Sequence, residues 1–180
     1  MHDDELFYFY RIKRKTSSTM RGQQSVETLI GVSPSIAWDA YRGLELGRLV
    51  DELFGEFLKV EVVEGDGGVG TIVKLTFPPG TPGTGNMTGY MKELFTVMDD
   101  DKRVKETELI EGGFKDMGFD VYHVRMEVIE KDDKSSVIRS TVEYEIDDSK
   151  PELASLVSTK QFELIAETVG KYLTQKKSTK

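Results

Sequence analysis

The chain has 180 residues, of which 38% are hydrophobic, and it carries a formal net charge of −8. That length suggests one domain with its own core, and the acidic balance argues against a nucleic-acid partner, because phosphate binding favours a basic face. The sequence has no cysteine, which excludes disulfides and thiol catalysis. No apolar run approaches the about 20 residues of a membrane span, so we expect a cytoplasmic protein without a membrane partner.

The first 19 residues are predicted to form a flexible N-terminal extension ahead of a single domain over residues 20–180. The apolar run Leu6–Tyr10 follows three acidic residues and precedes a basic patch and a polar linker. A secretory signal has a basic start and a longer apolar region, so this segment does not resemble one. A transit peptide is the alternative interpretation, against which the early acidic residues argue.

The first structured elements are predicted to be a strand and two short helices. Residues 23–32 alternate loosely between polar and apolar side chains, which indicates a strand. Ser33 and Pro34 then fit the N-cap and the first position of a helix, which Gly43 interrupts. A second short helix fits residues 45–53, where leucine and valine recur along one face.

From residue 57 the apolar period changes to two, which is typical of half-buried strands. Acidic or glycine-rich turns separate these runs at short intervals, so we expect an antiparallel meander. The predicted strands cover residues 57–64, 71–77, 88–98, 103–110, 117–130 and 135–146. Residues 78–89 hold two adjacent prolines and several glycines, and are predicted to form a flexible loop.

The stretch Gly65–Gly70 reads GDGGVG and fits the G-x-G-x-x-G fingerprint of dinucleotide-binding folds. That fingerprint requires a helix after the glycines, because the helix N-terminus holds the pyrophosphate. Residues 71–77 instead read as a strand, so we interpret the glycines as a turn between two antiparallel strands.

A long helix is predicted at the C-terminal end of the chain. Asp148 or Ser149 can cap it, and Pro151 falls near its first turn. The apolar stripe along this helix consists of Phe162, Ile165, Ala166, Val169, Tyr172 and Leu173. The sheet is the large apolar surface on which that stripe can pack, which predicts an α+β fold with helices on one side of a curved sheet. A curved sheet under a helix often leaves an internal pocket, where small ligands bind.

Several motifs carry a resemblance to a known family. They are GDGGVGT at 65–71, MKELF at 91–95, EGGF at 111–114, DMG at 116–118 and STVEY at 140–144. With the order of elements, they resemble the plant pathogenesis-related 10 / Bet v 1 family over residues 20–175, and within it the norcoclaurine synthase and norbelladine synthase branch. The resemblance implies a helix-grip fold, in which a seven-stranded curved antiparallel sheet surrounds a long C-terminal helix, two short helices close one end, and a hydrophobic cavity lies between.

The same resemblance implies an activity. Norcoclaurine synthases condense dopamine with an aryl acetaldehyde in a Pictet–Spengler reaction, using a lysine, a glutamate, a tyrosine and an aspartate. The glutamate falls on Glu93 and the lysine on Lys105, whereas the tyrosine and aspartate positions fall on Met91 and Val124. Norbelladine synthases carry Tyr-x-Lys-Glu ahead of the phenylalanine and also lack the aspartate, and here Tyr90 supplies that tyrosine. The implied function is a cofactor-independent condensation of a tyramine- or dopamine-type amine with an aromatic aldehyde in alkaloid biosynthesis, by a lyase-class enzyme.

The predicted catalytic residues are Glu93, Lys105 and Tyr90. A pocket carboxylate whose pKa is raised by burial is a suitable base for the amine, and a buried lysine can polarise the aldehyde oxygen or donate a proton. Side chains two apart on a strand share a face, so Glu93 should point the same way as Met91 and Phe95. On regular geometry Tyr90 faces away from the pocket, unless Gly89 introduces a local irregularity.

Side chains expected to contact substrate are Met91, Phe95, Phe77, Phe114, Tyr122, Val124 and Phe162. Met91, Phe77, Phe114 and Tyr122 are also explained as ordinary core, and Glu93 and Lys105 are also explained as solvent-facing residues of the sheet. The alternative to an enzyme is therefore a non-catalytic carrier of hydrophobic plant metabolites or hormones that uses the same cavity. We expect no cofactor and no metal site, and either a monomer or a homodimer.

Overall fold

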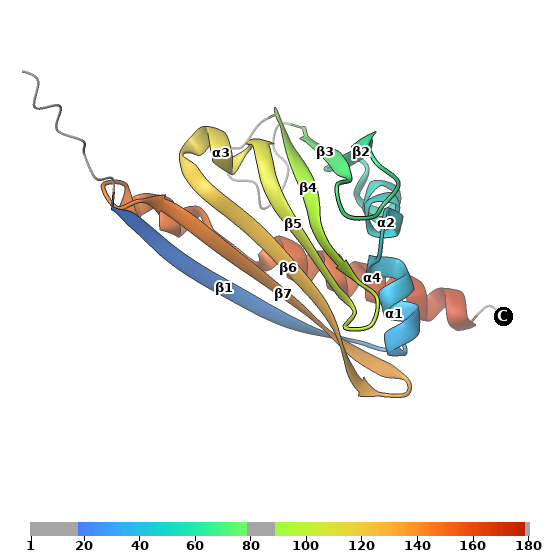
Figure 1. The fold of residues 1–180 in the computed structure, drawn as a ribbon. Coiled ribbons are helices and arrows are strands. Elements are labelled where there is room, and N and C mark those ends of the chain that lie inside the picture. The colour runs from blue at the N-terminus through green and yellow to red at the C-terminus, as the bar shows by residue number, and fades with distance from the viewer. Residues whose placement is uncertain (1–17, 79–88, 179–180) are drawn as a thin grey trace, which may run out of the picture.

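The computed structural model describes residues 18–78 and 89–178 (Figure 1). The predicted N-terminal extension lies outside the described residues except for Ser18 and Thr19, and the predicted loop at 78–89 lies outside them except for its end residues. Thr19 already pairs with Asp147 in the sheet, so the first strand begins one residue before the predicted start of the domain.

Seven antiparallel strands form a single sheet in the order β1-β7-β6-β5-β4-β3-β2. The strands are β1 (Thr19–Ile30), β2 (Lys59–Glu64), β3 (Ile72–Phe77), β4 (Gly89–Asp99), β5 (Val104–Gly112), β6 (Phe119–Asp132) and β7 (Ser135–Asp147). From β2 onward each strand pairs with the next one along the chain, while β1 pairs with β7, so β1 and β2 are the two edges. The predicted seven-stranded antiparallel meander is confirmed.

Two short helices follow β1, as the sequence predicts. They are α1 (Pro34–Tyr41) and α2 (Glu45–Phe54), and they lie together at one end of the sheet in Figure 1. Ser33 is the N-cap of α1 with an extended backbone, and Pro34 lies in the first turn, where a missing N–H costs nothing. A further one-turn helix, α3 (Phe114–Met117), lies where the sequence indicated only a turn and the beginning of a strand.

The long helix α4 (Lys160–Ser178) begins later than predicted. Residues Pro151–Leu156 form a separate 3₁₀ helix, η1, because the following residue, Val157, is extended and buried and so separates the two helices. The predicted capping residues belong instead to the turn after β7, where the Ser149 N–H donates to Asp147 Oδ1 at 2.8 Å.

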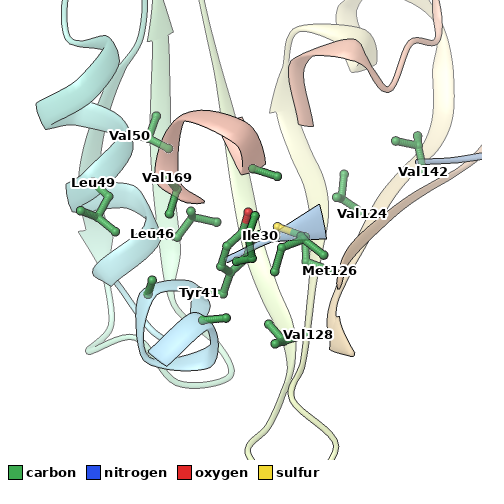
Figure 2. Close-up of a cluster of buried hydrophobic side chains, with 14 of the residues drawn as sticks. Ile30, Tyr41, Leu46, Leu49, Val50, Val124, Met126, Val128, Val142 and Val169 are labelled. Carbon is green, nitrogen blue, oxygen red and sulfur yellow. The ribbon is translucent and has the colours of Figure 1, made fainter. Parts of the chain in front are cut away.

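The core lies between α4 and the sheet, and the short helices extend it. Ala166 and Val169 of α4 are fully buried, and the other members of the predicted stripe pack around them. Figure 2 shows Leu46, Leu49 and Val50 of α2 on one side of this cluster, with side chains of β6 opposite. Over the described residues, no helix has both the length and the hydropathy that spanning a membrane requires.

Candidate active site

A cavity of about 900 Å³ lies between the sheet, α2 and the beginning of α4. Most of the side chains around it are apolar. The sheet contributes Val73, Leu75, Phe77, Met91, Phe95 and Met126, the short helices contribute Tyr41, Leu46, Val50 and Phe54, and α4 contributes Phe162, Leu164 and Ile165. A space of this size suits a small molecule rather than a macromolecule.

Glu93 projects into this cavity from β4, on the same face as Met91 and Phe95. The accessible part of its side chain faces the cavity rather than the protein exterior. Burial raises the pKa of Glu93, because a charged carboxylate loses its hydration there, while Lys105 and a hydrogen bond with Thr107 oppose that rise. Glu93 therefore has the character of a carboxylate that accepts a proton more readily than one in water.

Lys105 enters the same cavity from β5 and is 3% exposed. Its Nζ atom donates a hydrogen bond of 2.8 Å to the main-chain oxygen of Gly43 and lies 4.0 Å from the ring centroid of Phe95. Burial lowers the pKa of Lys105 to about 8, and the opposing attraction comes from Glu93. Near neutral pH this ammonium can lose its proton more easily than an exposed lysine.

A bulge in β4 brings the residues around Lys105 into position. Phe95 pairs with Thr107 and Val97 with Glu106, so Thr96 is an extra residue on β4. The extra residue reverses the alternation, so that Met98 faces inward beside its partner Lys105. Regular alternation from Glu93 predicts Val97 on the inner face instead.

The glycine-rich turn Gly65–Gly70 joins β2 to β3, which pair antiparallel, so its interpretation as a turn rather than a dinucleotide site is confirmed. The turn packs against the linker between α1 and α2. A Cβ atom on Gly67, where φ is +105°, would lie 3.1 Å from both Gly43 Cα and the Leu44 nitrogen. The Gly43 N–H in turn points at Met98 Sδ, 3.5 Å away. The turn thus supports the residue that holds Lys105.

Tyr90 does not reach the cavity. Its side chain is 40% exposed on the outer face of the sheet, where its hydroxyl donates to Glu111 Oε1 at 2.5 Å. The nearest irregularity in the β4–β5 pairing leaves Ile110 as the extra residue and does not turn Tyr90 inward. The suggested catalytic role of Tyr90 is corrected on this ground.

The predicted substrate contacts divide into two groups. The cavity wall contains Met91, Phe95, Phe77, Phe114, Tyr122 and Phe162. Val124 instead lies in the filled core, paired with Val142 on β7, and both are visible in Figure 2. Val124 is buried and does not line the cavity, so its predicted contact with substrate is corrected.

Thr107 and Gln161 are among the polar cavity residues that were not predicted from the sequence. Thr107 lies on β5, opposite Phe95 of β4. Because it is two residues from Lys105 on the same strand, the two side chains share a face, and this spacing could have identified Thr107 from the sequence. Gln161 lies one helical turn before Ile165, which places both on one face of α4. Over residues 18–78 and 89–178, no cluster of acidic or histidine side chains is arranged to hold a metal ion.

Tyr122 and Gln161 bring a further polar feature to the cavity. The Tyr122 ring stacks on Phe114, with centroids 4.2 Å apart and planes 8° from parallel. Tyr122 Oη and Gln161 Oε1 are both buried. Burial raises the pKa of Tyr122, Glu93 raises it further, and a hydrogen bond with the Gln161 side chain lowers it.

This chain matches the profile of one protein family and is similar to two known enzymes and one solved structure. The sequence profile of the pathogenesis-related protein Bet v 1 family matches residues 19–176. The norbelladine synthase of Narcissus pseudonarcissus is 43% identical over 88% of this chain and 96% of its own length. S-norcoclaurine synthase 1 of Papaver somniferum is 33% identical over 91% of this chain and 70% of its own length. The crystal structure of norcoclaurine synthase from Thalictrum flavum with dopamine and hydroxybenzaldehyde is 31% identical, with a TM-score of 0.75 over 88% of this chain and 89% of that one.

Proposed function

This chain belongs to the pathogenesis-related protein Bet v 1 family, and we propose that it condenses an aromatic amine of the tyramine or dopamine type with an aromatic aldehyde, without a cofactor. The single observation that carries the proposal is the placement of Glu93 and Lys105 in one apolar cavity. The prediction of an enzyme agrees with the relatives, which are named as synthases, and with the solved relative that holds dopamine and hydroxybenzaldehyde.

The first step that this pair supports is attack of the amine on the aldehyde. An ammonium substrate must lose a proton before its nitrogen lone pair can form the new C–N bond. Glu93 is suited to accept that proton, because burial raises its pKa and makes the carboxylate a stronger base. The apolar walls exclude water, which strengthens the attraction between the carboxylate and the ammonium.

The second step is loss of water from the carbinolamine. The hydroxyl leaves as water only after it gains a proton, and the Lys105 ammonium is suited to donate one, because its pKa is lowered to about 8. The products are a protonated imine and water. Transfer of the proton that Glu93 accepted to the neutral Lys105 then restores the carboxylate and the ammonium, and loss of the N–H proton from the protonated imine gives the imine. If ring closure follows, the aromatic carbon attacks the protonated imine and Glu93 accepts the proton that the ring releases.

The alternative function is a non-catalytic carrier of hydrophobic metabolites, which the largely apolar lining of the cavity favours. A carrier has no requirement for a base and an ammonium group in the same cavity. Burying both groups carries a desolvation cost, and proteins accept such costs most often at functional sites. We therefore favour an enzyme over a carrier.

The test is a product assay. Purified protein is incubated with tyramine or dopamine and a panel of aromatic aldehydes, with sodium borohydride added to part of each sample to trap the imine, and products are followed by mass spectrometry. We expect product above the buffer rate from wild type, and a loss of about a hundredfold or more for Glu93→Gln and for Lys105→Met.

Two results would count against the proposal in different ways. Wild type that binds an apolar dye but gives no product above buffer would favour the carrier. Product formation that survives both substitutions would mean that the activity depends on other residues. The Tyr90→Phe variant is the matched control, because it removes a polar group from the same strand on the opposite face.

A further inference from the structure

We propose that Thr107 is a positioning residue for the proposed base, and that its hydroxyl donates a hydrogen bond that turns the Glu93 carboxylate toward Lys105. The inference rests on the proposed function, because it assigns a role to a neighbour of the same base. It starts from the position of Thr107, which lines the cavity and is 2% exposed.

The pairing of β4 with β5 places Thr107 between the two reacting groups. Glu93 lies directly opposite Leu109. Thr107 is two residues before Leu109 on the same face of β5, which makes it the diagonal neighbour of Glu93, at a separation that a long side chain can span. Lys105 is the next inward residue of β5 beyond Thr107. A hydrogen bond between Glu93 and Thr107 therefore directs the carboxylate along β5 toward the ammonium group.

The hydrogen bond between Glu93 and Thr107 has a defined direction while Glu93 is ionised. A carboxylate only accepts hydrogen bonds, and a threonine hydroxyl has one proton to donate, so Thr107 is the donor. One carboxylate oxygen then accepts from the hydroxyl, and the other keeps its lone pairs for the proton of the substrate. Because a hydrogen bond to a charged acceptor is stronger than one to a neutral acceptor, it also opposes the rise that burial causes in the pKa of Glu93.

A threonine is suited to this role because its side chain has little rotational freedom. Two heavy atoms on Cβ restrict its first side-chain torsion, and the residue is held between Phe95 of β4 and Val124 of β6. The hydroxyl is therefore fixed in direction without adding a further charge to the apolar cavity. Holding the base in place before substrate arrives lowers the entropy cost of reaching the reactive arrangement.

The test follows the titration of Glu93 itself, without substrate. Protein labelled with carbon-13 at the glutamate carboxyl carbon is titrated by NMR, and the Glu93 signal is the one that Glu93→Gln removes. Thr107→Val keeps nearly the same shape but has no hydroxyl, and we expect it to move the midpoint of the Glu93 titration to higher pH by about one pH unit. Thr107→Ser keeps the hydroxyl and should titrate close to wild type.

Thr141→Val is the matched control. Thr141 is another buried threonine, hydrogen-bonded with Ser25 Oγ at 3.0 Å, and it does not line the cavity, so its replacement should leave the Glu93 titration unchanged. All the other titratable side chains that line the cavity, among the described residues, are kept in Thr107→Val. They are Tyr41, Arg48, Asp51, Lys105, Tyr122 and Lys160.

Initial rates connect the same contact with catalysis. In Thr107→Val the acidic limb of kcat/KM should move to higher pH by the amount that NMR measures, because that limb reports ionisation of the proposed base. The alkaline limb, which reports Lys105, should stay near its wild-type position. A general loss of stability would not move one limb and spare the other.

An unchanged Glu93 titration in Thr107→Val would overturn the proposal, and so would an equal rise of the midpoint in Thr107→Ser. If Thr107→Val fails to fold, Thr107→Ala takes its place, because it also lacks the hydroxyl and is compared with the same serine variant. A raised midpoint in a protein that forms no condensation product would support the contact between Thr107 and Glu93 while refuting the proposed function.

Discussion

Lys105 Nζ donates a 2.8 Å hydrogen bond to the main-chain oxygen of Gly43, which joins the sheet to the linker between α1 and α2. Gly67 of the glycine-rich turn packs directly on that linker, where a Cβ atom would lie 3.1 Å from the Gly43 Cα. The turn therefore affects the proposed acid, Lys105, indirectly. It fixes Gly43, and Gly43 fixes the ammonium group of Lys105.

The first prediction concerns this contact. In Gly67→Ala the new Cβ would lie 3.1 Å from the Gly43 Cα and the Leu44 nitrogen, so we expect the linker to shift and the hydrogen bond from Lys105 to Gly43 to weaken. We expect kcat/KM for the condensation to fall by about tenfold to a hundredfold, because small displacements of a reacting group are costly. Thermal unfolding of the same variant measures the accompanying loss of stability.

Gly70→Ala is the matched control for that experiment. Gly70 has φ +92°, close to the value at Gly67, but a Cβ there would meet no atom within 4 Å. The two variants carry comparable backbone strain, and only one of them collides with the linker. Equal losses of kcat/KM in both would show that strain in the turn, rather than the position of Gly43, explains the effect.

The second prediction concerns pH. The proposed acid, Lys105, must be protonated and the proposed base, Glu93, must be ionised. The value of kcat/KM should therefore fall as pH rises through the Lys105 pKa of about 8. It should also fall as pH drops through the Glu93 pKa, which burial places above the ordinary value of a glutamate. A pH series of initial rates measures both limbs, and Lys105→Met should lack the alkaline one.

The third prediction concerns the coupling between these two groups. The Glu93 carboxylate attracts the Lys105 proton and so raises the pKa of that lysine against the effect of burial. In Glu93→Gln the attraction disappears, so the Lys105 pKa should decrease and any residual alkaline limb should move to lower pH. A limb that stays at the wild-type pH would mean that the two groups do not interact.

The fourth prediction separates the outer face of the sheet from the inner one. Tyr90 contacts the exposed Glu111 and lies outside the cavity, so Tyr90→Phe should leave kcat/KM within about twofold of wild type. Steady-state rates measured beside those of Tyr122→Phe provide the comparison. A large loss in Tyr90→Phe would restore the catalytic role that the sequence suggested.

The fifth prediction tests the placement of Val124 in the core. Val124→Ala removes buried methyl groups beside Val142, and the free energy of unfolding should decrease by about 2 kcal/mol. Urea denaturation measures this change. Dye affinity should stay near that of wild type, since the side chain does not line the cavity, and a large change in affinity would contradict that placement.

Much of the fold and part of the site were predictable because they depend on local geometry. Alternation along a strand placed Met91, Glu93 and Phe95 on one face, and all three line the cavity. The same rule correctly pointed Tyr90 outward, even though the family resemblance suggested a catalytic role for it. The later beginning of α4 was missed because it depends on burial of Val157, a tertiary contact.

The sequence by itself determined the order of the elements along the chain, the apolar stripe of the last helix and the strand face that carries Glu93, because these follow from the periods of residues near one another in the chain. Only the tertiary structure decided which inward residues meet a cavity and which meet packed core, as for Glu93 and Val124. It also decided that Gly43 holds Lys105 and that Gln161 lies near Tyr122. The physical reason is that a cavity forms where a curved sheet and its helices fail to meet, and that gap is set jointly by residues far apart in sequence.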